Sequence, residues 1–118
     1  MKYFSTKGFS LIEAILSVTL LGMIAVSLGS ILIYSQQGSR LSGDRSQASF
    51  LAEQGLEAIR NIRDNDFSTL SSGTYGLTTT GNQWALSPTY PEIIDIFSRE
   101  IEISDLGLDR KMIKVKVG

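Results

Sequence analysis

One acidic side chain, Glu13, has a position that points to specific chemistry. It lies near the start of residues 9–34, a run in which no other residue is charged. A carboxylate inside a bilayer is costly and usually has a partner or a function. Cleavage between Gly8 and Phe9 would create an α-amino group four residues before Glu13, on the same chain or on a neighbour. The two charges could then pair. Alternatively, Glu13 simply reaches the headgroup region and needs no partner.

Other residue types exclude several kinds of chemistry. The chain has no histidine and no cysteine, so it lacks the commonest general base, the commonest zinc ligands and any disulfide. The close acid pairs, Glu53 with Glu57 and Glu100 with Glu102, suit solvated faces. Eleven basic and twelve acidic residues provide no general attraction for nucleic acid. We therefore expect no enzymatic activity, no metal, no cofactor and no specific nucleic-acid site.

Residues 9–34 have the length of a membrane span. As an α-helix they would extend about 39 Å, against about 30 Å for the hydrocarbon core of a bilayer. A cleaved secretory signal has a shorter apolar stretch with its cleavage site on the far side. Here the candidate site, between Gly8 and Phe9, comes before the run. We expect residues 9–34 to stay in the mature protein as one transmembrane helix in contact with membrane lipid.

Residues 1–8 form a basic leader. They contain Lys2 and Lys7 and no acidic residue. The side of a membrane span that is richer in lysine and arginine usually stays in the cytoplasm. We therefore expect a single-pass protein of the cytoplasmic membrane, with its N-terminus inside and everything after the span outside.

Small residues mark one face of the span. Gly22, Ala25 and Gly29 share that face and could let helices approach closely, as small residues do in membranes. Such residues are common in membrane helices, so the pattern alone requires no partner.

Residues 35–66 are expected to form the outer, amphipathic half of the same helix. No proline occurs between Phe9 and Asp66, so one helix could run through both halves, softened near Gly38 and Gly43. Small and apolar residues then recur at three- and four-residue spacing, at Ala48, Leu51, Gly55, Ala58, Ile59 and Ile62. This spacing predicts a buried stripe along one helix face.

Residues 67–118 have the pattern of a small antiparallel sheet. Residues 74–78 and 83–86 predict a hairpin around Gly81 and Asn82. Residues 97–104 and 113–117 alternate like half-buried strands, joined through residues 105–110. A sheet of about four strands needs a cover for its apolar face, and the helical stripe is the available surface. The expected class is α+β, a long N-terminal helix packed against a small antiparallel sheet.

Two further expectations concern this sheet. Four aromatic residues are expected in its core, namely Phe67, Tyr75, Trp84 and Phe97. The last apolar strand position is Val117, so either a partner completes that edge or the natural protein continues past Gly118.

The N-terminal residues together resemble those of the type IV pilins and pseudopilins, the class III signal-peptide proteins. The resemblance rests on a basic leader ending in Lys7 and Gly8, then Phe9, then Glu13 and a long apolar helix. It implies that a membrane aspartyl peptidase, the prepilin peptidase, cuts after Gly8 and N-methylates Phe9. It also implies that Glu13 neutralises a neighbouring subunit's terminus as a filament grows. The implied partners are the peptidase, other pilin subunits and the membrane assembly machinery, and the implied product is a pilus or pseudopilus outside the membrane.

The motif covers about the first thirty residues, and the rest resembles the family in layout. Residues 51–64 are similar to the outer helix of cysteine-free pilin-like proteins. Many pilins have a proline midway along the span and a disulfide near the C-terminus, and this chain has neither. Helix melting on assembly would have to use Gly22, Gly29 or residues 38–43. The alternative hypothesis is an uncleaved single-span anchor that presents a small binding domain outside the cell. The motif leaves open a major or minor subunit, and motility, adhesion, DNA uptake or secretion.

Overall fold

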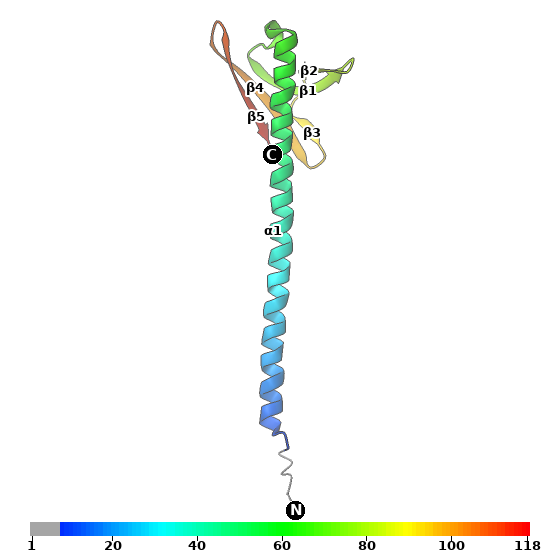
Figure 1. Ribbon diagram of the computed structural model, residues 1–118, viewed down its shortest axis with the longest axis vertical. Coiled ribbons are helices and arrows are strands. Elements are labelled where there is room, and N and C mark those ends of the chain that lie inside the picture. Colours follow the sequence, from blue (N-terminus) through cyan, green and yellow to red (C-terminus); the bar gives the residue numbers. More distant parts are fainter. Residues whose placement is uncertain (1–7) are drawn as a thin grey trace, which may run out of the picture. The chain divides into compact units, whose positions relative to one another are not determined.

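The computed structural model describes residues 8–118, which form one long helix, one short helix and five strands. In chain order these are α1 (Leu11–Asn65), the 3₁₀ helix η1 (Phe67–Thr69), β1 (Gly73–Thr80), β2 (Gln83–Ser87), β3 (Glu92–Ile94), β4 (Phe97–Gly107) and β5 (Arg110–Val117) (Figure 1). The expected α+β class, a long N-terminal helix packed against a small antiparallel sheet, is confirmed.

The chain divides into two compact units between Leu41 and Ser42. α1 nevertheless remains helical through Gly38 and Gly43, as expected from the absence of proline. In the first unit, Gly8, Phe9 and Ser10 precede the helix. The leader lysines, Lys2 and Lys7, lie outside the described residues.

In the second unit, β4 is the central strand of an antiparallel sheet. β5 pairs along one edge of β4, from the Arg99–Val117 pair to the Gly107–Arg110 pair. β1 and β3 share the opposite edge, with β3 against residues 97–99 and β1 against residues 101–103. β2 extends the sheet beyond β1, so β4 connects all the strands.

One face of this sheet packs against the C-terminal part of α1, which runs alongside the strands in Figure 1. The expected stripe is buried at Leu51, Gly55, Ala58, Ile59 and Ile62, while Ala48 is half-buried. The inward residues of β4 are buried in alternation, at Phe97, Arg99, Ile101 and Ile103. Each fully buried leucine or isoleucine stabilises the fold by roughly 1.5–3 kcal/mol. The predicted packing of stripe against sheet is therefore confirmed.

The expectation of about four short strands was wrong in two respects. The additional strand β3 follows the cis bond between Tyr90 and Pro91 and is only three residues long, too short for a clear alternation. β4 also reaches Gly107 and β5 begins at Arg110, so the connection expected over residues 105–110 shrinks to a tight turn. Residues 105–107 of β4 are exposed, which is why no apolar alternation marks this part of the hairpin.

The expectation for the aromatic residues holds in part. Phe97 is buried, and Tyr75 and Trp84 are half-buried and pack against the core. Phe67 is 40 % exposed, so its placement in the core was wrong. It lies in η1, with the Lys111 ammonium 5.4 Å from its ring centroid, a cation–π contact.

The end of α1 is defined by Asp66. Its backbone is extended, and its carboxylate accepts hydrogen bonds from the backbone N–H and the hydroxyl of Ser68, at 2.9 and 2.6 Å. These bonds lower the pKa of Asp66, and they cap the first turn of η1. The chain therefore leaves the long helix and turns back toward the sheet at this residue.

Residues 67–118, with their five strands, are here called the head. Gly76 provides a test of how closely the head is packed. A Cβ added at this buried position of β1 would overlap the carbonyl oxygen of Thr89. We expect Gly76→Ala to lower the free energy of unfolding by about 1–3 kcal/mol, because the backbone must shift. Denaturant titration of the full chain in detergent, followed by the fluorescence of its single tryptophan, Trp84, would measure this.

Gly43→Ala is the matched control, since an added Cβ there meets nothing within 4 Å and the residue is helical. It should leave stability unchanged or raise it by up to about 1 kcal/mol. Equal stability of Gly76→Ala and the unchanged chain would contradict the packing described for β1.

Candidate functional site

The candidate cleavage site lies in exposed, non-helical backbone. Gly8, Phe9 and Ser10 are all exposed, and the Phe9 side chain is 83 % exposed. The first helical hydrogen bond runs from the backbone N–H of Ala14 to the carbonyl oxygen of Ser10, at 3.1 Å. The bond between Gly8 and Phe9 thus precedes the helix, where backbone is most accessible to a protease.

Glu13 lies in the first turn of α1 and is exposed. The positive end of the helix dipole stabilises a carboxylate at this position by typically 0.3–1 kcal/mol. Among residues 8–118, no ion pair or hydrogen bond involves its carboxylate; its backbone carbonyl accepts from the Ser17 hydroxyl. The structure therefore places Gly8, Phe9 and Glu13 in one short segment, with the carboxylate open to a partner from outside that range.

One pattern in this segment was not among the predictions. Ser10 and Glu13 have the serine-x-x-glutamate spacing of a capping box, in which the two side chains bond to each other's backbone N–H groups. Within residues 8–118 neither of these side-chain bonds is formed. A local capping role is nevertheless a second reason for an acid at this position, and an experiment on Glu13 must separate it from a role in pairing.

The surface of α1 that follows Glu13 is apolar and uncovered. Sixteen large apolar side chains in residues 9–34 are between 54 and 83 % exposed. Such a continuous surface is far larger than the apolar patches of soluble monomers, so it requires lipid or other protein surfaces around it. In the described part of the chain, α1 is the one helix long and apolar enough to cross a membrane.

Most hydroxyl groups of this run bond within the helix. Four hydroxyl groups donate to the carbonyl oxygen four residues earlier, at 2.8–3.0 Å: those of Ser17, Thr19, Ser27 and Ser30. An apolar medium offers these groups no other partner, so internal bonds suit lipid or a protein interior equally.

The small-residue face is also open, because a Cβ added at Gly22 or Gly29 would meet nothing within 4 Å. Ala25 on the same face is exposed.

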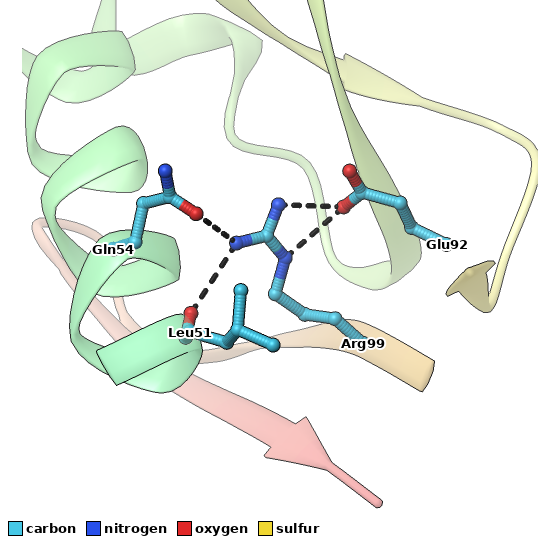
Figure 2. A network of polar contacts seen from close by, with 4 residues as sticks. All are labelled: Leu51, Gln54, Glu92 and Arg99. Carbon is cyan, nitrogen blue, oxygen red and sulfur yellow. Dashed lines mark hydrogen bonds and ion pairs between the residues drawn. The ribbon is translucent and has the colours of Figure 1, made fainter. Parts of the chain in front are cut away.

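Arg99 joins the head to the helix that carries it. Its side chain is 2 % exposed, at the junction of β4, β3 and α1. The guanidinium donates twice to one carboxylate oxygen of Glu92, at 2.7 and 3.0 Å. Its third nitrogen donates to the backbone carbonyl of Leu51 at 3.2 Å and to the side-chain oxygen of Gln54 at 3.0 Å (Figure 2). One side chain thus connects two strands to the helix.

Gly55 makes this junction possible. It is buried within α1, although glycine costs about 1 kcal/mol relative to alanine inside a helix. A Cβ at this position would lie 3.0 Å from a methyl group of Val115 and 3.5 Å from Cδ of Arg99. The absence of a side chain therefore lets β5 approach the helix and leaves room for the arginine to reach the Leu51 carbonyl.

Ion pairs between charged side chains join β4 to β5 within their hairpin. Lys111 donates to the carbonyl oxygen of Leu70 and pairs with Asp105 at 3.1 Å. The Ser72 hydroxyl and Lys111 together lower the pKa of Asp105. Hydrogen bonds with Lys116 lower the pKa of Glu102, and Glu100 and Glu102 raise the pKa of Lys116. The pairs of Lys116 are partly exposed, so each contributes little to stability, while Lys111 is more deeply buried.

Among residues 8–118, no group of three or more acidic side chains could hold a metal ion. Comparisons of the chain with protein-family models, curated proteins and solved structures found no match. The function is therefore inferred from the N-terminal segment, the apolar surface and the helix–head junction.

The Arg99 junction yields a prediction about stability. We expect Arg99→Met to lower the free energy of unfolding by about 3–5 kcal/mol, because it leaves the Glu92 carboxylate and the Leu51 and Gln54 oxygens without their donor. The double variant Arg99→Met with Glu92→Leu should recover much of the loss, since it removes both charges. Denaturant unfolding of the full chain in detergent would measure both variants.

Arg60→Met is the matched control, because Arg60 pairs with Glu57 at 3.2 Å on an exposed face. It should change stability by about 0.5 kcal/mol or less. A loss for Arg99→Met as small as the loss for Arg60→Met would contradict the role given to the buried guanidinium.

Proposed function

We propose that this chain is a type IV pilin-like structural subunit. The precursor is held in the cytoplasmic membrane by residues 9–34, with its N-terminus in the cytoplasm. A prepilin peptidase cuts after Gly8 and N-methylates Phe9. The membrane assembly machinery then builds copies of the chain, or the chain with other pilin subunits, into a pilus or pseudopilus.

The observation that carries this proposal is the order of features at the start of α1. An accessible bond between Gly8 and Phe9 is followed by an open carboxylate at Glu13 and then by an apolar surface uncovered on all sides. Each feature alone has an ordinary explanation. An accessible bond occurs in many termini, a carboxylate can cap a helix, and an apolar helix can be a plain anchor. A filament subunit uses all three together.

The pairing of charges follows from cleavage. Trimming converts Phe9 into a positively charged terminus close to the first turn of α1, where Glu13 is exposed. Both charges are costly in an apolar medium, and each lowers the cost of the other when they are close. Between parallel helices shifted along their axes, the Glu13 of one copy can meet the terminus of the next. This pairing sets the axial step of the assembly.

The apolar surface has a partner at every stage of this route. In the precursor, lipid surrounds residues 9–34, and in a filament the same residues of neighbouring copies surround them. Four hydroxyl groups inside the run bond to the helix backbone and keep these partners when protein replaces lipid. The small-residue face of Gly22, Ala25 and Gly29 allows close helix contacts in the filament.

Mass spectrometry can test the proposed trimming. Mass spectrometry of the purified protein from its native host should show loss of residues 1–8 and one added methyl group on Phe9. Replacing Gly8 by leucine should block this step, because a bulky side chain would sit where the peptidase requires glycine, and the full-length mass should remain. An untrimmed chain starting at Met1 in the unmodified protein would support the single-span anchor instead, and a correctly trimmed Gly8→Leu product would refute the role of Gly8.

The proposed role of the Glu13 charge in assembly can be tested by substitution. Glu13→Gln keeps a side chain that can serve in a capping box but removes the charge. We expect membrane insertion and trimming to be unchanged and the amount of chain in sheared filaments to fall about tenfold or more, since tenfold corresponds to only about 1.4 kcal/mol. Filament yield would be measured by electron microscopy and immunoblotting.

Glu57→Gln serves as the matched control, because Glu57 is an exposed acid on the outer half of α1. It should assemble normally. Normal incorporation of Glu13→Gln would show that the charge has no part in assembly and would leave the capping role as the explanation for this residue.

A further inference from the structure

The turn between β3 and β4 forms an exposed apolar projection with an acid in it, here called the acidic knob (Ile93, Asp95 and Ile96). Ile93 is 69 % exposed and Ile96 is 70 % exposed. Asp95 lies between them with a left-handed backbone, φ 57°, which holds the turn tight. Within residues 8–118, no ion pair involves the Asp95 carboxylate. Two β-branched apolar side chains and an unpaired acid are therefore presented together.

At the other end of β4 lies a cavity of about 460 Å³, here called the basic groove. Its walls include apolar side chains from three elements, Leu56 of α1, Phe67 of η1 and Leu106 of β4, all at least 40 % exposed. Its basic lining residues are Arg60, Arg63, Arg110 and Lys111, against a single acid, Asp109. The groove thus combines apolar walls with several basic side chains.

Most of the basic residues of the groove already have partners. Arg60 pairs with Glu57, Arg63 with Asp64 at 2.7 Å, and Lys111 with Asp105. Within residues 8–118, neither Arg110 nor the lining acid Asp109 is in an ion pair. Among the four basic residues, Arg110 is therefore the one available to pair with an acid that enters the groove. The knob has an unpaired acid beside exposed apolar side chains, and the groove has an unpaired arginine beside its own.

We propose that the acidic knob of one copy docks into the basic groove of a second copy of this chain. In the docked pair, Ile96 and Ile93 contact the apolar walls and Asp95 pairs with Arg110. The proposal rests on the proposed function in taking copies of the chain as neighbours along a filament.

The positions of the two surfaces favour another copy over a small anionic ligand. The turn that leads into β4 from β3 and the turn that leads out of it to β5 lie at opposite ends of this strand (Figure 1). The knob is at the first turn and the groove is beside the second, and the eleven residues of β4 span roughly 33 Å. A contact between different patches of identical subunits is heterologous, so every copy can use both surfaces at once and the contact repeats into a ring or an open helical assembly. The volume would also admit a small ligand, but a small anion would leave the exposed isoleucines of the knob without any partner.

Cysteine cross-linking can test this docking cleanly, because the chain has no cysteine of its own. Ile96→Cys and Leu106→Cys would be placed in the same full-length chain, expressed in the native host and oxidised mildly in the membrane and sheared-filament fractions. We expect a ladder of covalent multimers. The two substituted positions cannot bridge within one chain, because a disulfide requires Cα atoms within about 7 Å.

Two sets of controls accompany this variant. Each single cysteine should give no ladder, and neither should Ile96→Cys with Lys114→Cys, since Lys114 is exposed on β5 outside the groove. In the cross-linking background, Asp95→Arg or Arg110→Asp should each lower the multimer yield roughly two- to fivefold, the range for an exposed ion pair. The two charge reversals combined in one chain should restore it.

The outcomes separate the docking from the proposed function. Trimmed filaments without a ladder would overturn the docking and leave the pilin-like role standing. An untrimmed chain would overturn the pilin-like role. The docking would then still be decided by the membrane fraction, where a ladder would support it and the absence of a ladder would contradict it. A ladder that the charge reversals do not change would refute the Asp95–Arg110 pair.

Discussion

The structure depends on one buried charge at the place where helix and sheet meet. Arg99 occupies an inward position of β4 that an apolar residue would ordinarily fill, and it binds β3 through Glu92 and α1 through Leu51 and Gln54. Burial of an ion pair contributes little net stability, but breaking one is costly, so the arrangement enforces a single register. It specifies which turn of the helix faces which residue of the sheet. In a chain without disulfides, that polar junction fixes how the small head sits on its part of α1.

The sequence predicted the features that depend on periodicity. The three- and four-residue spacing in α1 correctly identified the buried stripe, and the alternation in β4 correctly identified its inward face, because burial on one side leaves a repeating pattern. Arg99 shows the limit of this reasoning. Alternation placed it inward, but its partners come from β3 and from a helix about forty-five residues earlier, and only the pairing of strands brings them together. β3 was missed because three residues carry no detectable period, and Phe67 because hydrophobicity alone does not distinguish a core residue from one beneath a lysine.

For the candidate site, the sequence named the residues while the structure supplied their surroundings. Gly8, Phe9 and Glu13 were identified from residue types and spacing, and their exposure at the start of α1 is the new information. The roles of these residues in trimming and assembly stay predictions, because they concern partners outside the chain. The basic groove and the acidic knob had no counterpart in the sequence analysis, since each collects residues from separate elements whose proximity only the fold determines.

The hydroxyl groups inside the apolar run have a consequence for the energetics of any assembly built on α1. Four of these hydroxyl groups are already bonded to the helix backbone, and lipid tails are about as apolar as leucine. Moving the uncharged part of this run from a bilayer into a protein bundle therefore changes its solvation free energy little. The free energy that holds together a polymer of such helices would therefore come from helix packing and charge pairing and not from a change of solvent. A machine that breaks those contacts could return subunits intact to the lipid.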